Sequence, residues 1–299
     1  MTEEKIPKLS VILPVFNAEE FVVDAIDSVL NQSFPDFELI IIDDCSTDKT
    51  YDLLIKKENE DSRIKVYKNE RNLKLIKTLN FGLSVARGEY IVRMDADDIC
   101  NQFRFSEQYE CIKKTGAVIV GSNYNIFGTK KRKIKLPEDN LSCKLALLTC
   151  SPFCHPSVML DLNKIRKFNI NYNDNYPHAE DFEFFIRLSQ VGEVYNIQKP
   201  LLYYRYHNAQ VSNVYSKEQM ESRVKAIIKH YNFSDDLLIS QIIEYANLKK
   251  EGDKKLLCKG LLELLFTRNE KLNIRCWANI FLWGSIIDII KYLIKVCVK

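Results

Sequence analysis

Three carboxylates lie within four positions of the stretch YIVRMDADDIC, residues 90–100. An apolar run that predicts a buried strand comes first, and Asp95, Asp97 and Asp98 follow it. Carboxylates this close disfavour one another's charged forms. Mg²⁺ and Mn²⁺ prefer carboxylate, water and phosphate oxygens, and either ion relieves this repulsion. The spacing predicts a metal site that a substrate diphosphate completes. The alternative is an acidic turn that caps the next helix, and Asp98 alone fits that description.

The residues before this stretch alternate between apolar runs and segments with apolar residues at helical spacing. The alternation predicts a mostly parallel sheet with helices on both faces, in which ligands bind beyond the carboxyl ends of the strands. After the first strand, Asn17 is the expected N-cap of a helix within 16–33, with Glu20 three residues later. The predicted strands are 8–15, 37–44, 63–69 and 89–95, and the next two helices are 46–59 and 73–86.

Acidic residues also end the second predicted strand, at Asp43 and Asp44. Carboxylates from two strands are therefore expected to converge on one crevice at the edge of the sheet. The chain has neither G-x-G-x-x-G after its first strand nor G-x-x-x-x-G-K-[ST] anywhere. Their absence disfavours a dinucleotide-binding Rossmann protein and a P-loop NTPase.

The later residues carry weaker signals. We expect a domain over residues 1–214 and a helical C-terminal region over 215–299. The first of these would hold a helix at 101–115, a strand at 117–122 and a helix at 178–192. It would also hold a basic loop or hairpin at 127–137 and a strand-like segment within 199–212.

Composition excludes several classes of protein. The 299 residues carry a net charge of +3, too weak to favour nucleic acid as a partner. Nine cysteines without a C-x-x-C pair favour free thiols in a reducing cytosol. We find no export signal and no apolar run long enough to span a membrane. A cytoplasmic protein is expected.

Several motifs in order, over residues 8–212, resemble the family 2 glycosyltransferases, which have the GT-A fold. They are SVILPVFNAEE with IIIDDCSTDKT, then ARGEYIVRMDADD, SPFCHPSVM, AEDFEFFIRL and YYRYHNAQVS. The bacterial members that build lipopolysaccharide and other surface polysaccharides are most similar. The resemblance implies an inverting transfer of a hexose or N-acetylhexosamine from a nucleotide-sugar, with a UDP-sugar the expected donor, to a glycan or lipid-linked glycan.

The resemblance assigns donor-side roles by position. Pro14 and Phe16 would border the nucleobase, and Asp44 would accept a hydrogen bond from uracil. Asp95 would reach the ribose and, with Asp97, hold Mn²⁺ or Mg²⁺.

Two further positions near the end of the motif set would close the donor site. Arg205 would lie over the diphosphate, and His207 would join the metal ligands. A purely structural histidine is the alternative for His207.

The acceptor side is assigned in the same way. Asp181 matches the catalytic base of inverting members, which an acceptor hydroxyl requires because it is a poor nucleophile. Glu180 beside it and His155 would line the acceptor side. The alternatives are an acidic first helical turn for the pair and a core or loop histidine for His155.

The sequence departs from the family pattern at two positions. Cys45 stands where the family commonly has glycine, so a positive φ there would be strained. Lys74 stands at a second common glycine position, either as a solvated helix residue or as a contact to the nucleotide.

Two other functions fit the sequence less well than a transferase does. A sugar-phosphate nucleotidyltransferase needs a glycine-rich loop after the first strand, and LPVFNAEE is not one. A non-catalytic subunit that binds nucleotide-sugar or glycan needs neither Asp97 nor Asp181, and both are present.

The C-terminal residues 276–299 predict a basic amphipathic helix with a tryptophan. Such a helix either lies on the inner face of a membrane or packs on a partner. Its apolar positions are Ile280, Trp283, Ile287, Ile290 and Ile294, and its basic ones are Lys291, Lys295 and Lys299.

Overall fold

The computed structural model of the chain describes residues 6–147, 150–207 and 215–231. The chain divides into two compact units. The first contains residues 1–138, 153–172 and 188–208, and the second contains 139–152, 173–187 and 209–299. The predicted division at 214/215 stays a prediction, and the predicted tail helix lies outside the described residues.

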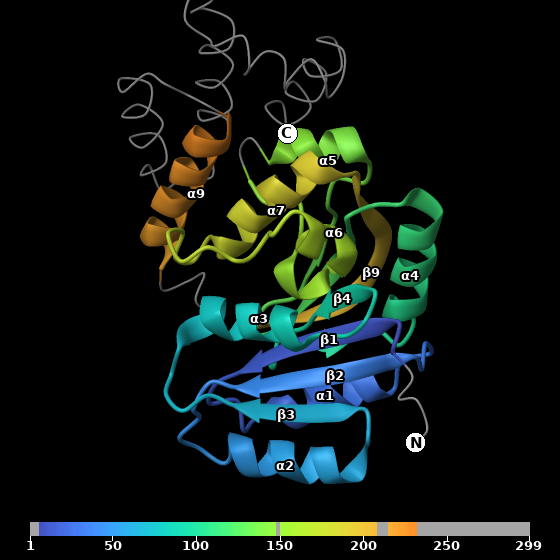
Figure 1. The fold of residues 1–299 in the computed structure, drawn as a ribbon, viewed down its shortest axis with the longest axis vertical. Helices are drawn as coiled ribbons and strands as arrows, with labels where there is room; N and C mark the ends of the chain where they lie inside the picture. The colour runs from blue at the N-terminus through green and yellow to red at the C-terminus, as the bar shows by residue number, and fades with distance from the viewer. Residues whose placement is uncertain (1–5, 148–149, 208–214, 232–299) are drawn as a thin grey trace, which may run out of the picture. The chain divides into compact units, whose positions relative to one another are not determined.

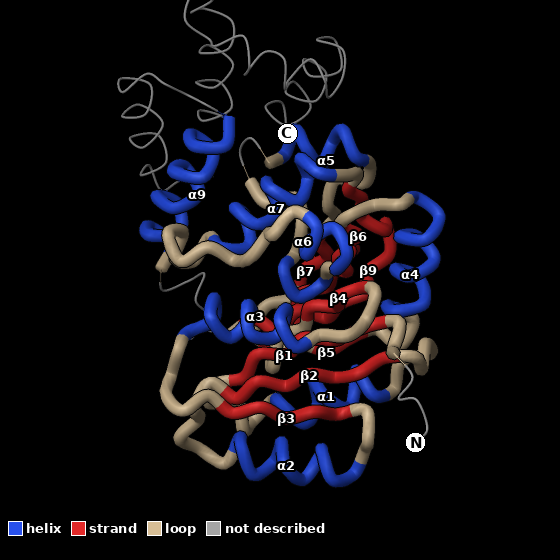
Figure 2. Tube along the Cα trace, in the orientation of Figure 1, coloured by secondary structure: helices blue, strands red, loops and turns tan. Residues whose placement is uncertain are grey.

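One nine-stranded sheet, shown in Figures 1 and 2, forms the centre of the first unit. The strand order is β3-β2-β1-β4-β8-β6-β9-β5, and β7 pairs with β6. The β1–β2, β2–β3, β1–β4 and β6–β9 pairs are parallel. The strands are β1 Leu9–Val15, β2 Phe37–Asp43, β3 Ile64–Lys68, β4 Tyr90–Arg93, β5 Ile99–Cys100, β6 Ile119–Gly128, β7 Arg132–Ile134, β8 Met159–Asp161 and β9 Val194–Tyr206.

The helices that connect these strands cover both faces of the sheet. Side chains of successive β1 residues point to opposite faces, and those on each face contact helices. Val11 and Leu13 belong to the core cluster with residues of α1 and α2, whereas Ile12 packs against Gly82 of α3. The predicted mostly parallel sheet with helices on both faces is therefore confirmed. The helices of the first unit are α1 Val22–Leu30, α2 Thr50–Glu60, α3 Lys74–Val85, α4 Arg104–Thr115, the short 3₁₀ turn η1 His155–Ser157 and α6 Leu162–Lys167.

The strands end together at one edge of the sheet. Val15 pairs with Asp43, so β1 and β2 finish level. Ile12 pairs with Arg93, and the Met94 amide donates to the Ile12 carbonyl at 3.1 Å. The chain that leaves β4 therefore emerges beside the chains that leave β1 and β2.

The second unit contains α5 Asn140–Ala146, the start of α7 Glu180–Val191 and α9 Ser216–Tyr231. Glu183 of α7 is 1% exposed and accepts hydrogen bonds from Arg187 at 2.7 Å and His230 at 2.8 Å. Burial raises the pKa of Glu183, but these hydrogen bonds outweigh burial and hold its pKa below the ordinary value. The contact between Glu183 and His230 joins α7 to α9.

Local sequence signals misplaced some boundaries. Asn17 does not cap α1, which begins at Val22 after Phe21 without a side-chain cap. Instead Asn17 has φ 47° and its side-chain oxygen accepts from the Thr47 amide at 2.8 Å. Sheet pairing extends β6 to Gly128, beyond the predicted end at 122, and it forms the two-residue β5 that local pattern did not predict.

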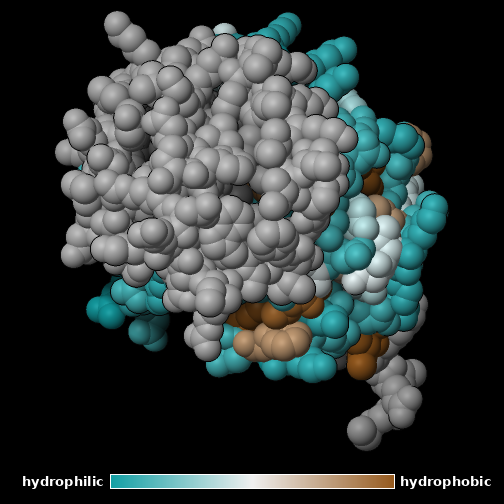
Figure 3. Space-filling model, turned by 90° about the horizontal axis from the view of Figure 1, so that it is seen from above, coloured by the Kyte–Doolittle hydropathy of each residue, from teal (hydrophilic) through white to brown (hydrophobic). Residues whose placement is uncertain are grey.

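Figure 3 shows mainly hydrophilic residues among those described, with apolar ones in small separate groups. Isolated exposed apolar side chains are normal. All six cysteines of the described residues are free, as expected. No described helix is long and apolar enough to span a bilayer.

A close backbone approach at Gly88 generates a test of the fold. A Cβ there would lie 2.7 Å from the Ser10 amide nitrogen, so Gly88→Ala should destabilise the first unit by roughly 1–3 kcal/mol. Urea unfolding measures this loss. The exposed control Ser84→Ala on α3 should stay within about 0.5 kcal/mol of the wild type. Equal midpoints for the two variants would contradict the packing at Gly88.

Candidate active site

The three carboxylates after β4 form one cluster. Asp95, Asp97 and Asp98 each offer an oxygen within 4.8 Å of the others. Asp95 and Asp97 are half-buried, and Asp98 is 1% exposed. Within the described residues this is the one group of three potential metal ligands.

Asp98 shows that the cluster suits a cation. Its Oδ1 accepts from the Arg205 amide at 2.8 Å, but its buried Oδ2 has no hydrogen-bond partner among the described residues. Burial raises the pKa of Asp98, and the charges of Asp95 and Asp97 raise it further. Asp98 is not the helix cap considered as an alternative, because α4 has no side-chain cap. A hard cation matches this all-oxygen donor set.

A buried arginine fixes the first carboxylate. Arg93, at the end of β4, is 2% exposed and forms an ion pair with Asp95. The carboxylate of Asp95, the first residue of the acidic segment, is therefore held in place by a residue of the sheet.

Arg205 is held between two aromatic rings. Its guanidinium carbon lies 4.6 Å from the ring centroids of both Phe21 and Phe127. Its Nε donates to the Asp97 carbonyl at 2.7 Å. The short β5–β9 pairing brings β9 beside the acidic segment. The predicted donor residue Arg205 thus lies next to the carboxylate cluster.

His207 also meets the acidic segment. Its Nε2 lies 3.0 Å from Asp97 Oδ2, and its ring stacks on Phe21 with centroids 5.9 Å apart. The structure therefore places His207 against Asp97, whereas the group of mutually close potential ligands is Asp95, Asp97 and Asp98.

Asp44 lies at the neighbouring strand end and is 5% exposed. Its Oδ1 accepts from Leu73 N at 2.7 Å and from Asn69 Nδ2 at 2.8 Å. Its Oδ2 accepts from Lys74 N at 2.9 Å. An ionised carboxylate offers about four lone-pair sites, so Oδ2 keeps one for a ligand donor. Asp43 is fully buried, and both of its carboxylate oxygens accept from Ser46 N.

The other predicted base contacts differ in accessibility. Pro14 is buried inside β1, whereas Phe16, just past the strand, is 48% exposed. Phe16 is therefore the member of the pair with a ring surface open to a ligand.

Both departures from the family pattern have left-handed backbones. Cys45 has φ 63° and Lys74 has φ 71°. The strain expected at Cys45 is therefore present, and Lys74 shares it. The two residues flank Asp44, because Cys45 follows it and the Lys74 amide bonds to it. The Lys74 side chain is exposed.

His155 opens the 3₁₀ turn in the first unit. Its Nε2 lies 2.9 Å from the Tyr172 hydroxyl. Burial lowers the pKa of His155 well below its ordinary value, and the Arg93 charge lowers it further. The ring is consequently neutral near pH 7, able to exchange a hydrogen bond without carrying charge.

Glu180 and Asp181 lie in the second unit, in the first turn of α7. Glu180 is 7% exposed, and Asp181 is half-buried with its Oδ1 2.7 Å from the Phe182 amide. The predicted position near a helix start is confirmed, and the helix dipole favours the carboxylate form there.

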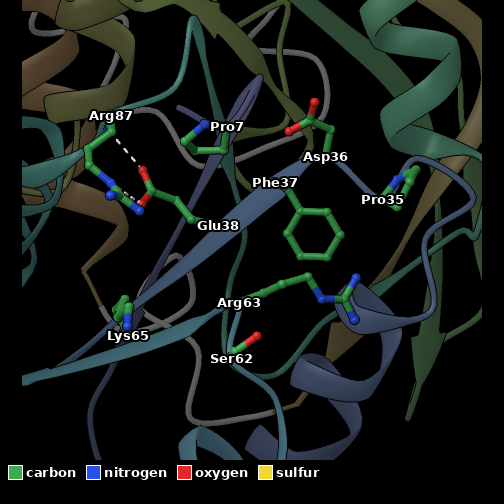
Figure 4. A pocket seen from close by; sticks show the side chains of 9 residues that line it. All are labelled: Pro7, Pro35, Asp36, Phe37, Glu38, Ser62, Arg63, Lys65 and Arg87. Atoms are coloured by element: carbon green, nitrogen blue, oxygen red, sulfur yellow. Dashed lines mark hydrogen bonds and ion pairs between the residues drawn. The ribbon is translucent and has the colours of Figure 1, made fainter. Parts of the chain in front are cut away.

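A separate pocket opens at the opposite edge of the same sheet (Figure 4), at the amino ends of β1, β2 and β3. Its two arginines already have partners. Arg87 donates to Glu38 at 2.9 Å, and Arg63 pairs with Asp61 and lies over the Phe37 ring. Ligands of parallel sheets bind at carboxyl ends, so this pocket is not the candidate active site.

Sequence reasoning missed the residues that support the site. Phe21 and Phe127 enclose Arg205, and Tyr172 contacts His155. An aromatic residue on a helix or strand carries no local signal for such contacts, because ordinary core packing has the same pattern. The basic residues of the predicted hairpin did not indicate that Phe127 contacts Arg205.

The fold resembles that of solved GT-A glycosyltransferases. S. aureus TarS residues 1–349 in complex with UDP-GlcNAc aligns with a TM-score of 0.66 at 20% identity, over 96% of this chain and 81% of that one. The mannosyltransferase PcManGT from Pyrobaculum calidifontis, in complex with GDP-Man and Mn²⁺, aligns with a TM-score of 0.60 at 16% identity. That alignment covers 98% of this chain and 86% of PcManGT. The fold class is therefore that of a GT-A glycosyltransferase.

Sequence similarity identifies the family. The model described as Glycosyl transferase family 2 matches residues 10–178. An uncharacterized glycosyltransferase of Haemophilus influenzae is 33% identical over 77% of this chain and 75% of its own length. The putative teichuronic acid biosynthesis glycosyltransferase TuaG of Bacillus subtilis is 30% identical over 69% of this chain and 82% of its own. The chain belongs to glycosyl transferase family 2.

The strained cysteine beside Asp44 provides a stability test. Cys45→Gly should raise the free energy of unfolding by roughly 0.5–1 kcal/mol, because glycine relieves the left-handed strain but adds unfolded-state entropy. Urea unfolding measures the gain. The control Cys111→Gly makes the same change inside helix α4 and should lose about 1 kcal/mol. A loss at Cys45 as large as that at Cys111 would rule out the strain.

Proposed function

We propose that this chain is an inverting, divalent-metal-dependent glycosyltransferase that uses a UDP-sugar. The sugar is a hexose or N-acetylhexosamine, and the acceptor is a glycan or lipid-linked glycan of bacterial surface polysaccharide. The cluster of Asp95, Asp97 and Asp98, with the unpartnered buried Asp98 Oδ2, is the observation that carries the proposal. The relative named for teichuronic acid biosynthesis, TuaG, and the UDP-GlcNAc complex of TarS support it.

The donor site has three parts on the first unit. Phe16 offers its exposed ring to the base, and the remaining site on Asp44 Oδ2 accepts from the uracil N–H. Asp95, Asp97 and His207 would hold Mn²⁺ or Mg²⁺, and Asp95 would also reach the ribose. The ion, when bound, offsets the charge of the diphosphate leaving group. Arg205, fixed between its two rings, adds a second positive charge beside the diphosphate.

The acceptor chemistry requires a base. Asp181 takes the proton from the acceptor hydroxyl as that oxygen attacks the anomeric carbon and the bond to the diphosphate breaks. In-line displacement inverts the anomeric centre, so an α-linked donor gives a β-linked product. The role of Asp181 is supported by the family motif and by its half-buried position in the first turn of α7. Glu180 and His155 serve the acceptor side.

Donor and metal are tested together by thermal shift. The wild type is screened with UDP-, GDP- and dTDP-sugars, each with and without Mn²⁺. A ligand at a hundredfold excess over its dissociation constant stabilises the folded state by about 2.7 kcal/mol. We expect a Mn²⁺-dependent shift with a UDP-sugar that Asp97→Ala abolishes. A shift with GDP or dTDP compounds alone would overturn the uracil assignment of Asp44.

The control for that screen is Asp36→Ala, which removes a half-buried carboxylate at the opposite edge of the sheet. It should leave the Mn²⁺-dependent shift intact. A shift that survives both EDTA and Asp97→Ala would contradict the metal site.

The base is tested by Asp181→Asn. The amide cannot accept the proton, so kcat should fall roughly 10²–10⁴-fold while the UDP-sugar affinity stays the same. UDP release with a panel of glycan acceptors measures kcat, and the exposed Asp174→Asn in the same unit is the control. A variant that keeps nearly the wild-type rate would remove Asp181 from the mechanism. Donor binding by a wild type that turns over no acceptor would favour the non-catalytic binding subunit.

A further inference from the structure

Arg104 of α4 is a fully buried cation. Its exposed fraction is 0%, and it makes no ion pair with any residue in the described parts of the chain. A buried charge without a counter-charge is costly unless its hydrogen bonds are satisfied. The position of this guanidinium therefore needs an explanation.

All five N–H donors of the guanidinium have acceptors, which is the maximum that arginine offers. Nε donates to Gln108 Oε1 at 3.0 Å. One terminal nitrogen faces two sulfurs, Cys100 Sγ at 3.3 Å and Met94 Sδ at 3.7 Å. The other donates to the carbonyls of Arg93 at 2.8 Å and Val158 at 3.2 Å.

Three of these five acceptors lie at the two ends of the acidic segment 95–98. Arg93 and Met94 immediately precede it, and Cys100 follows it by two positions. Cys100 Sγ and Met94 Sδ are themselves 3.6 Å apart. One rigid fork therefore connects the residues that begin the segment to the residue that ends it, from the side of the core.

Gln108, one helical turn later, extends the connection. Its Nε2 donates to the carbonyls of Val120 in β6 and Ser157 in the 3₁₀ turn, both at 2.7 Å. Gln108 is also 0% exposed. The same buried network thus joins the acidic segment to the turn that carries His155.

We propose that Arg104 and Gln108 are positioning residues that set the spacing of the metal-binding carboxylates. This inference rests on the proposed function of that cluster. Neither side chain is a metal ligand, because Arg104 acts through the backbone of Arg93 and the sulfurs of Met94 and Cys100. The fork holds the three like charges at a separation that they would not keep alone, ready for a cation.

Lysine cannot take this place. Its ammonium carries three donors on a flexible stem, whereas the planar guanidinium presents five in a fixed geometry. Arg104→Lys keeps the positive charge but cannot donate to the Arg93 carbonyl and the Cys100 sulfur at the same time. The variant therefore separates the effect of geometry from that of charge.

The test measures Mn²⁺ binding directly in the full chain. Mn²⁺ is titrated in the presence of saturating UDP, and free Mn²⁺ is followed by its electron paramagnetic resonance signal. Loss of residues that orient metal ligands typically weakens metal binding by about 10–100-fold. We expect that loss for Arg104→Lys, at a temperature where circular dichroism shows the variant folded.

The matched control is Glu38→Gln, at the opposite edge of the sheet. Glu38 is 6% exposed and accepts from Ser10 at 2.6 Å and from the Arg87 amide at 2.8 Å. Glu38 belongs to a buried polar network of similar kind, at the amino end of β2, whereas the acidic segment follows the carboxyl end of β4. Glu38→Gln should lower stability and leave Mn²⁺ affinity unchanged. If a general loss of stability caused the weaker Mn²⁺ binding of Arg104→Lys, Glu38→Gln would weaken it as well.

A milder variant decides the matter if Arg104→Lys does not fold. Cys100→Ala removes only the acceptor behind the acidic segment and should weaken Mn²⁺ binding about threefold, the size of one modest hydrogen bond. Unchanged Mn²⁺ affinity in either folded variant, with a wild type that binds Mn²⁺, overturns the inference alone. A wild type that binds no Mn²⁺ with UDP overturns the proposed function, and the inference with it.

Discussion

Repulsion among three carboxylates is the constraint on which the site depends. Asp95, Asp97 and Asp98 emerge from a strand in the middle of the sheet, where one of them is almost completely buried. The surrounding groups are arranged to keep them together. Arg93 pairs with the first, His207 meets the second, and the Arg205 amide bonds to the third. On the core side, the Arg104 guanidinium contacts none of the carboxylates. It bonds to residues at both ends of the acidic segment 95–98. The proposed cation would relieve the repulsion within this acidic cluster.

The sheet supplies the second half of the arrangement. Because β1, β2 and β4 are parallel and in register, the residues that follow them share one edge. Asp44 at that edge organises the neighbouring loop by accepting from two consecutive amides, Leu73 and Lys74. Lys74, whose amide bonds to this carboxylate, has a left-handed backbone, and so does Cys45, the residue after Asp44. Strain of this kind persists where the surrounding structure determines the conformation, and such positions often border functional sites.

Particular elements show how far the sequence alone leads. The alternation of apolar runs and helical spacing predicted β1 to β4 and α1 to α3 because each signal is local and repeated. The sequence pattern could not predict a short element such as β5, since its two residues form a strand only because β9 lies beside them. The N-cap predicted at Asn17 failed because its side chain found a partner in the loop after β2 instead of its own helix. Local propensity lost to a contact that spans about thirty residues.

The sequence by itself determined the family and the parallel sheet, and its family resemblance assigned the candidate site residues, because all of these depend on residue type and order. Asp44, Asp95, Asp97, Asp181, Arg205 and His207 were all predicted on that basis. Only the tertiary structure decided how the groups on the sheet are held. The stacking of Arg205 between Phe21 and Phe127, the unpartnered Asp98 oxygen and the fork of Arg104 arise from segments distant in sequence. Such contacts follow from strand pairing and burial, which no local pattern of residues encodes.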